Sequence, residues 1–186
     1  MQDFSDSLSG TTAIVAFFDK TAVWVANVGD SRAIIGKVSN GEMKATPLST
    51  DQTPYRKDER ERVRAAGGEI MSVDQRDGHV PMHDNWDMDL GAETDTDGDP
   101  PRVWVPGKDK PGCAFTRSIG DSMGERVGVI ADPELTKKEL KEHDRFVCIC
   151  SDGVWEFLTN NAVADMIVEY EEPLAACRAV VAESYR

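Results

Sequence analysis

Long apolar runs separated by short turns mark the N-terminal part of the chain. Residues 11–18 and 22–28 are almost wholly apolar, and a third run covers 32–38. Continuous runs of this kind, rather than strict alternation of apolar and polar positions, predict strands that are covered on both faces. The tripeptide Gly-Asp-Ser at 29–31 separates the second run from the third, and its composition predicts a turn that closes a tight hairpin.

A helix and a long irregular excursion follow these runs. Residues 58–66 have helical spacing, with Val63 and Ala66 on one side and charges elsewhere, and a Gly-Gly pair ends the pattern. No regular periodicity persists from 71 to 112, and the stretch 84–99 holds seven acids and no Lys or Arg. We therefore expect an acidic surface flap at 71–112 that lies outside the core.

Regular structure resumes in the second half of the chain. An apolar run at 127–131 is followed by a predicted strand at 146–150, which ends at a Ser-Asp-Gly turn. Thr159 caps the first of two closing helices, and Pro173 takes the first position of the second. The apolar stripes of these helices contain Val163, Met166, Ile167 and Tyr170 in the first and Leu174, Cys177 and Val181 in the second. Because helices do not alternate with strands, this order predicts a mixed layered fold rather than a parallel βαβ protein.

The composition is that of a folded domain with a strong negative charge. Of 186 residues 40% are hydrophobic, which is enough to bury a core, and the formal net charge is −13 at pH 7. This charge repels nucleic-acid backbones and anionic lipid, so we expect no nucleic acid and no membrane as partner. No apolar run approaches the about 20 residues of a spanning helix, and the N-terminus does not resemble a signal peptide.

The cysteines predict a reduced protein. There are four, too few and too unevenly placed for a disulfide framework. Cys148 and Cys150 are two residues apart on the predicted strand, so both would face the same side as small hydrophobic groups. A zinc site would need a second pair of ligands, which the sequence does not offer. We therefore expect a cytoplasmic protein, with the nucleus as the alternative location.

Two aspartates, Asp30 and Asp152, each end an apolar strand at a glycine-containing turn. A carboxylate at the rim of a packed sheet is held rigidly and still reaches solvent, which suits a hard divalent cation. The alternative is that both aspartates simply form Asx turns, where Asp is common. Position alone does not decide between a cation site and two turns.

Short motifs around these aspartates favour the cation site. They occur in this order: SGTTA at 9–13, VANVGDSRA at 25–33, DQTP at 51–54, GG at 67–68, FTRSIGD at 115–121 and SDGVWE at 151–156. Together they resemble the metal-dependent serine/threonine phosphatases of the protein phosphatase 2C family, from about residue 9 to the C-terminus. The stretch 98–107 is also similar to members that are fused to cyclic-nucleotide-binding and kinase domains.

The resemblance implies a fold and a chemistry. The fold is α+β, a four-layer α-β-β-α sandwich of two antiparallel sheets, with two or three Mg²⁺ or Mn²⁺ ions at one end. Paired ions about 3.5–4 Å apart lower the pKa of a bridging water, which attacks the phosphorus of phosphoserine or phosphothreonine proteins, and they neutralise the charge on the phosphoryl oxygens. An acidic flap beside this site would favour phosphopeptides flanked by Lys or Arg.

Three acids of the chain match family metal ligands. By motif, Asp152 matches a metal aspartate, and Asp30 matches the aspartate of a third, more weakly held ion. Glu156 stands where members usually carry a second aspartate, four residues after the first. Glu reaches one methylene further than Asp, so we expect the affinity or geometry of the third ion to differ here.

Other motifs of the family are absent from the sequence. They are a phosphate-gripping arginine, a Glu-Asp pair and an Asp-Gly-His-Gly-Gly segment before residue 9, and an Asp-Asn motif beyond Arg186. Residues 1–186 therefore resemble a partial catalytic domain that is incomplete at both ends, and no catalytic residue is assigned. We expect this chain alone to be inactive and to self-associate through edges and an apolar face exposed by truncation. The alternative is a non-catalytic binding or regulatory module on a phosphatase scaffold.

Several remaining features have structural interpretations. His79 ends a DGH tripeptide that repeats the start of the missing motif, but Val-Pro follows it, so we interpret the match as chance. The segment 95–99 hints at a calcium loop, yet prolines stand where that loop needs Gly and Glu. We expect Arg117 and Asp121 to brace their motif and Trp155 to pack in the core.

Overall fold

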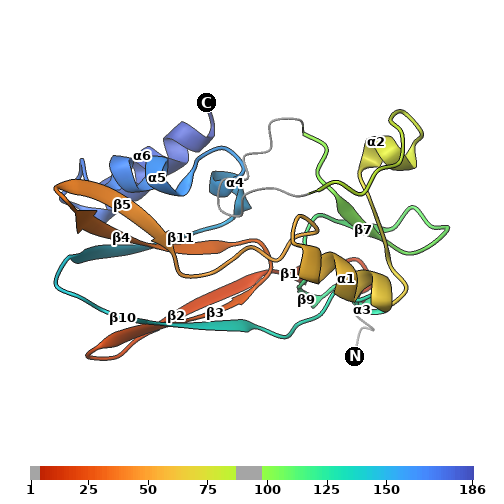
Figure 1. Cartoon of the computed structure of the whole chain (residues 1–186), viewed down its shortest axis with the longest axis horizontal. Helices are drawn as coiled ribbons and strands as arrows, with labels where there is room; N and C mark the ends of the chain where they lie inside the picture. The colour runs from red at the N-terminus through yellow and green to blue at the C-terminus, as the bar shows by residue number, and fades with distance from the viewer. Residues whose placement is uncertain (1–4, 87–97) are drawn as a thin grey trace.

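The computed structural model describes residues 5–86 and 98–186, and two stacked antiparallel sheets form its centre (Figure 1). The strand orders are β10-β3-β2 and β11-β4-β5. The strands of the first sheet are β2 (Ala13–Phe18), β3 (Ala22–Val28) and β10 (Glu134–Glu139); those of the second are β4 (Arg32–Ser39), β5 (Glu42–Pro47) and β11 (Asp144–Cys150). This arrangement confirms the expected α+β fold with antiparallel sheets.

The turn at 29–31 carries the chain from one sheet to the other. β3 pairs with β2 and β10, whereas β4 pairs with β5 and β11, so the expected hairpin does not form. The prediction was wrong because two apolar strands joined by a short turn can also pack face to face. Val23 and Val25 of β3 meet Ala33 and Ile35 of β4 in the core between the sheets.

Helices cover the other face of the β11-β4-β5 sheet. They are α4 (Asp152–Trp155), α5 (Asn160–Ile167) and α6 (Pro173–Ser184). Ile34, which points away from the core between the sheets, packs with Val163 of α5 and Val180 of α6. β4 is therefore covered on both faces, as its unbroken apolar run predicts. None of the described helices is long and apolar enough to cross a membrane.

The predicted helix starts are confirmed, but one predicted stripe is not. Thr159 Oγ1 accepts a hydrogen bond from the backbone N–H of Ala162 at 3.2 Å, and Pro173 opens α6. The buried residues of α6 are Ala176, Val180 and Ser184, whereas the predicted Leu174, Cys177 and Val181 are exposed, as is Tyr170 beyond the end of α5. α6 has small or apolar residues on most of its sides, so only contact with the sheet decides which side is buried.

The outer face of the β10-β3-β2 sheet is apolar and exposed. Val15 and Phe17 of β2 and Leu135 of β10 are exposed, Phe17 by 65% and Leu135 by 75%. The strand registers place Phe17 and Lys137 on either side of Trp24. No helix among the described residues lies on this face (Figure 1). The expectation that strands are covered on both faces is thus wrong, in the part of the chain that is described, for β2 and for β3, whose Trp24 is 44% exposed.

A smaller sheet lies beside this sandwich. It contains β6 (Glu69–Met71), β7 (Arg102–Trp104) and β8 (Pro111–Cys113), and it is accompanied by α1 (Lys57–Ala65), α2 (Val73–Arg76) and α3 (Ser122–Glu125). Two short strands, β1 (Gly10–Thr11) and β9 (Ile119–Gly120), pair with each other. Through β1 and β9, the motifs at 9–13 and 115–121 meet.

The smaller sheet has its own core, which includes part of the predicted flap. Val103 and Trp86 are buried, and they pack in one cluster with Val63, Ile70, Val127 and Val129. The expectation that 71–112 lies outside the core is therefore wrong for Trp86 and Val103, whereas residues 77–85 and 106–110 are exposed. Trp86 lies within the acidic stretch 84–99 and Val103 follows it, and the composition around them does not indicate burial. The acids between 87 and 97, and most of the calcium-loop-like segment, lie outside the described residues.

Candidate functional site

Asp30 lies in the turn that joins the two sheets, and its neighbours hold that turn in place. Gly29 has φ of +106°, and a Cβ at this position would lie 2.4 Å from Cγ2 of Thr12. The Gly29 N–H donates to Oε1 of Gln52 at 2.6 Å, and Asn27 Nδ2 donates to the Gly29 carbonyl at 3.0 Å. The glycine permits the left-handed backbone and the close approach, so the position of Asp30 is set by its surroundings.

Asp152 is the first residue of α4, directly beyond β11. Its Oδ1 accepts a hydrogen bond from the Gly153 N–H at 2.8 Å, and the Glu156 N–H donates to the Asp152 carbonyl at 2.9 Å. Residues four apart on a helix share a side, so Asp152 and Glu156 project in the same direction. Both residues are exposed, which leaves their carboxylates accessible from solvent.

The sheet register brings Asp30 and Asp152 together. β4 and β11 are antiparallel neighbours, and Arg32 lies opposite Cys150. Asp30 precedes Arg32 by two residues and Asp152 follows Cys150 by two, so the turns that carry them leave the sheet side by side. The two turns that the sequence singled out therefore meet at one end of this sheet, where α4 begins (Figure 1).

The electrostatics of Asp30 show that other acids lie nearby. Burial raises the pKa of Asp30 from 3.8 to about 7, and the negative charge of Asp152 adds to this rise, with smaller contributions from Asp51 and Glu156. Four carboxylates thus interact around one turn. Asp51 was not among the predicted site residues; its place in the DQTP motif was the only signal for it.

Asp51 is held in a bidentate ion pair with Arg32. Arg32 donates from Nε to Oδ1 at 2.8 Å and from Nη2 to Oδ2 at 2.7 Å. Both side chains are almost completely buried. This bidentate pair fixes Asp51, and we assign it no role as a cation ligand.

The donor set of Asp30, Asp152 and Glu156 fits a hard divalent cation. All three offer carboxylate oxygens, the ligands that Mg²⁺ and Mn²⁺ prefer. A cation beside Asp30 would favour its charged form and offset the burial and repulsion that oppose ionisation. Asp30 is half-buried, whereas Asp152 and Glu156 are exposed, so an ion from solvent can reach at least these two carboxylates.

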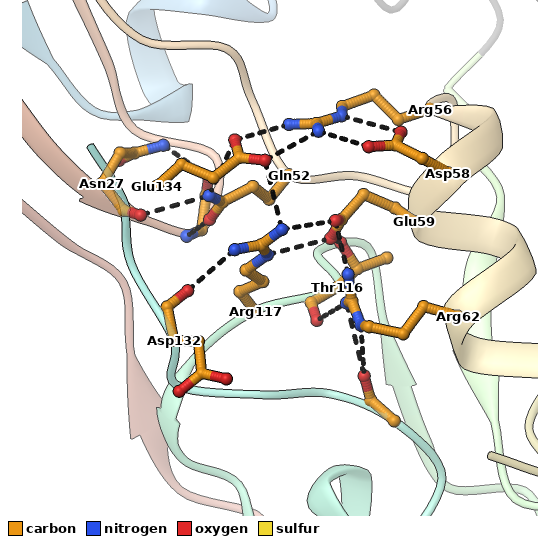
Figure 2. Close-up of polar contacts among 12 residues, drawn as sticks. Asn27, Gln52, Arg56, Asp58, Glu59, Arg62, Thr116, Arg117, Asp132 and Glu134 are labelled. Carbon is orange, nitrogen blue, oxygen red and sulfur yellow. Dashed lines mark hydrogen bonds and ion pairs between the residues drawn. The ribbon is translucent and has the colours of Figure 1, made fainter. Parts of the chain in front are cut away.

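A second acidic cluster contains Asp58, Glu59 and Glu134, whose oxygens lie within 4.8 Å of one another. Figure 2 shows that arginines surround it: Arg56 lies between Asp58 and Glu134, and Arg117 lies between Glu59 and Glu134. Arg56 donates to Glu134 at 2.7 and 2.8 Å. Because arginines already occupy these oxygens, we interpret the cluster as an ion-pair network rather than a cation site.

Glu59 is the buried centre of this network. Burial alone would raise its pKa, but hydrogen bonds from Arg117, Arg62 and Thr116 outweigh burial and lower the pKa to about 2. The sequence shows no sign of this role, since a glutamate on a charged helix is normally assigned to the solvent side. The buried side of α1 contains Glu59, Arg60 and Val63, so two of its three buried residues are charged.

Arg117 and Asp121 brace the loop that carries them. Arg117 donates to Glu59 at 2.7 Å, to Glu134 at 3.1 Å and to the carbonyl of Asp132 at 2.8 Å. Asp121, at φ of +50°, accepts from Ser118 Oγ at 2.6 Å. Gln52 connects the network to the Asp30 turn, because its Nε2 donates to Glu134 at 3.2 Å while its Oε1 accepts from Gly29 (Figure 2). These contacts match the bracing role expected from the sequence.

The other side chains considered in the sequence have local partners. Trp155 is buried as predicted, and its Nε1 donates to the Cys150 carbonyl at 2.9 Å. His79 is exposed and lies 3.3 Å from the Asp74 carboxylate. The Sγ atoms of Cys148 and Cys150 are 3.5 Å apart on one side of β11, and both thiols are free.

Comparison with known proteins agrees with the motifs. The family described as Protein phosphatase 2C matches residues 1–186. Probable protein phosphatase 2C 35 of Arabidopsis thaliana is 45% identical over 185 residues, which cover 99% of this chain and 52% of that protein. Probable protein phosphatase 2C 72 of the same plant is 32% identical, with 99% of this chain and 50% of that protein covered. The chain thus spans about half the length of these curated relatives.

Solved structures share the fold. A serine-threonine phosphatase 2C from Toxoplasma gondii matches with a TM-score of 0.73 at 16% identity, covering 96% of this chain and 54% of that one. A C. elegans sex determining protein matches with a TM-score of 0.63 at 20% identity, covering 94% of this chain and 36% of that one. At these identities the likeness concerns the fold alone.

Proposed function

Because the chain belongs to the protein phosphatase 2C family, we propose that it supplies part of the cation site of a protein serine/threonine phosphatase. The proposed ligands are Asp30, Asp152 and Glu156. The observation that carries this proposal is the β4–β11 pairing, whose last pair is Arg32 with Cys150, so that the turns with Asp30 and Asp152 leave the same end of the sheet. Their mutual repulsion supports it, since the charge of Asp152 raises the pKa of Asp30.

The residues of this chain would position the oxygen donors. Gln52 and Asn27 hold the turn that carries Asp30, and the first turn of α4 holds Asp152. Mg²⁺ or Mn²⁺, when bound, would supply activated water and neutralise the charge on a phosphoryl group. The longer side chain of Glu156 would let it reach the site from the solvent side of α4. Two carboxylates on supported turns and a third on a longer side chain are the arrangement we assign to the site.

Activity, substrate class and wider architecture belong to the same proposal. We propose phosphoserine and phosphothreonine proteins of the cytoplasm or nucleus as substrates, and a preference for Lys or Arg beside the phosphorylated residue because of the seven acids at 84–99. A helical layer over the exposed face of the β10-β3-β2 sheet would complete the four-layer sandwich. Fusion to cyclic-nucleotide-binding and kinase domains, suggested by the stretch 98–107, also remains a prediction.

We expect the 186-residue chain to bind a cation weakly and to be inactive by itself. The resemblance assigns further ligands and a phosphate-gripping arginine to motifs that this sequence does not contain. Three carboxylates can hold one hard cation, but they do not supply both ions of a two-ion centre or contacts to a phosphoryl group.

Binding of Mn²⁺ tests the site directly. The amplitude of the free Mn²⁺ signal in electron paramagnetic resonance gives the affinity of the chain for the ion. We expect Asp152→Asn to weaken binding at least about tenfold, as loss of a coordinating charge implies. Asp165→Asn is the matched control, because it removes one exposed carboxylate from the neighbouring helix α5. Equal binding by wild type and Asp152→Asn would refute the assignment.

Activity is tested in the complete protein. We expect Mn²⁺-stimulated hydrolysis of a phosphothreonine peptide and its loss in Asp152→Ala. A complete protein that is folded and binds Mn²⁺ but hydrolyses no phosphopeptide would instead support the non-catalytic binding module.

A further inference from the structure

Arg32 lies at the junction between the two turns that carry the proposed ligands. It follows Asp30 by two residues on β4, and it lies opposite Cys150, which precedes Asp152 by two residues on β11. Its side chain is only 3% exposed. An arginine is rarely buried to this degree unless its donors are all engaged, so its contacts show what it holds.

Contacts of Arg32 lead to the Asp51 loop, to α4 and to the start of α5. Two of its nitrogens grip the Asp51 carboxylate at 2.8 and 2.7 Å. Its Nη1 donates to Oδ1 of Asn160, the first residue of α5, at 2.9 Å. Its guanidinium carbon lies 5.1 Å from the ring centroid of Trp155, within the range of a cation–π contact.

These contacts act on the α4 turn from both sides. Trp155 is the last residue of α4, which begins at Asp152, and Asn160 opens the next helix. The Trp155 ring and the first residue of α5 thus contact the same guanidinium, that of Arg32. Arg32 is the first residue of β4, two positions after Asp30. A shift of α4 relative to β4 would break the stacking and the Asn160 hydrogen bond together.

We infer that Arg32 is a positioning residue for the cation site: it sets the spacing between the Asp30 turn and the Asp152 turn and neutralises the adjacent Asp51. This inference rests on the proposed function, because it assigns Arg32 a task toward the ion that Asp30 and Asp152 would hold. In this assignment Arg32 is not itself a ligand of the ion. It acts through the backbone that presents the two carboxylates.

Lysine cannot replace this arginine. Lys keeps the positive charge, but it lacks the planar fork that grips Asp51 while also reaching Asn160, and it lacks the flat face that stacks on Trp155. Arg32→Lys should therefore leave the local charge unchanged and loosen the relative position of the two turns. Loss of such supporting contacts typically weakens metal binding about 10–100-fold.

The experiment compares Mn²⁺ affinities of the 186-residue chain by the free-ion signal in electron paramagnetic resonance, with thermal stability measured in parallel. We expect Arg32→Lys to weaken Mn²⁺ binding at least about tenfold. Arg60→Lys is the matched control. Arg60 is also buried, but it lies in α1 and donates to the carbonyls of Pro54 and Tyr55. We expect this control to lower thermal stability and leave the Mn²⁺ affinity unchanged within about twofold.

A folded Arg32→Lys variant with wild-type affinity overturns the inference, as does an equal loss of affinity in both Lys variants. If Arg32→Lys does not fold, Asn160→Ala decides, because it removes one Arg32 contact and leaves the buried ion pair intact; weaker Mn²⁺ binding supports the inference, and unchanged binding overturns it. Failure of the proposed function looks different, since wild type and Asp152→Asn would then bind Mn²⁺ equally or not at all.

Discussion

The backbone N–H of Gly29 donates a 2.6 Å hydrogen bond to Oε1 of Gln52, whose side chain is completely buried. Nε2 of the same Gln52 side chain donates to the Asn27 carbonyl at 3.1 Å and to the Glu134 carboxylate at 3.2 Å. A single amide therefore ties the turn that carries Asp30 to the charged network around Glu59. The position of the proposed ligand depends on residues that lie far from it in the sequence.

Gly29→Ala should destabilise the protein more than a comparable substitution elsewhere. Gly41 also has a positive φ, +83°, but no atom lies within 4 Å of a Cβ added there, so Gly41→Ala should cost about 1–2 kcal/mol from backbone strain alone. At Gly29 the added Cβ also meets Thr12, and this overpacking should cost about 1–3 kcal/mol more. Urea unfolding of both variants measures the difference. Equal losses of stability would show that the turn relaxes away from Thr12.

Asp30 should make the stability of the ion-free protein fall as pH rises. Its pKa is 3.8 when unperturbed and about 7 in the folded state, so the folded state holds the proton more tightly. The resulting stabilisation is fully present below about pH 4 and is lost as pH rises through about 7. Asp30→Asn cannot titrate, so the unfolding free energy of wild type minus that of the variant should decrease between pH 4 and 7 and then level off. Urea unfolding at several pH values without divalent ions checks this, and a difference that stays constant would contradict it.

Glu59→Gln should be strongly destabilising. Glu59 is 1% exposed and receives hydrogen bonds from Arg62, Thr116 and Arg117. Removing the charge leaves Arg117 and Arg62 without their central partner, and loss of one member of a buried ion pair typically costs about 3–5 kcal/mol. Glu61→Gln on the same helix is the control, because that side chain is 64% exposed and its change should stay within about 0.5 kcal/mol. Similar denaturation midpoints for both variants would remove the structural role assigned to the network.

The exposed face of the β10-β3-β2 sheet should drive self-association of the 186-residue chain. Phe17 and Leu135 are among its most exposed apolar side chains, and apolar surface of this kind associates in water. Sedimentation velocity should show a coefficient that rises with protein concentration. The double variant Phe17→Thr with Leu135→Thr should reduce this rise, since Thr keeps a high strand propensity.

Tyr185→Thr is the control for that experiment, because Tyr185 is 87% exposed but lies at the end of α6, away from the sheet face. It should leave the concentration dependence as in wild type. A wild-type chain that remains a monodisperse monomer at every concentration would show that the face does not associate.

Strands with polar sequences show the limit of pattern-based prediction. β5 reads Glu-Met-Lys-Ala-Thr-Pro and β10 reads Glu-Leu-Thr-Lys-Lys-Glu, and neither has the apolar run that marked β3 and β4. Both lie at the edge of their sheets, where one neighbour strand suffices. Their pairing with apolar central strands, rather than their own composition, makes them strands.

In the candidate site, too, local sequence patterns indicate some residues and only tertiary packing reveals others. Asp30, Asp152 and Glu156 stand out in the sequence because glycine-containing turns and a helical spacing of four are local features. Asp51 and Arg32 appear in the sequence only as members of the quoted motifs, because their pairing depends on burial against each other across 19 positions of the chain. No local pattern records such a pair.

By itself, the amino-acid sequence determined the apolar strands, the capped starts of the two closing helices and the turns that carry the two aspartates, since each depends on the conformational preferences of neighbouring residues. Only the tertiary structure decided that β3 and β4 belong to different sheets, that Glu59 is the buried centre of an arginine network, and that Arg32 joins both acidic turns. Those outcomes depend on which distant segments share a core, and burial and electrostatic energies are set by that packing rather than by adjacency along the chain.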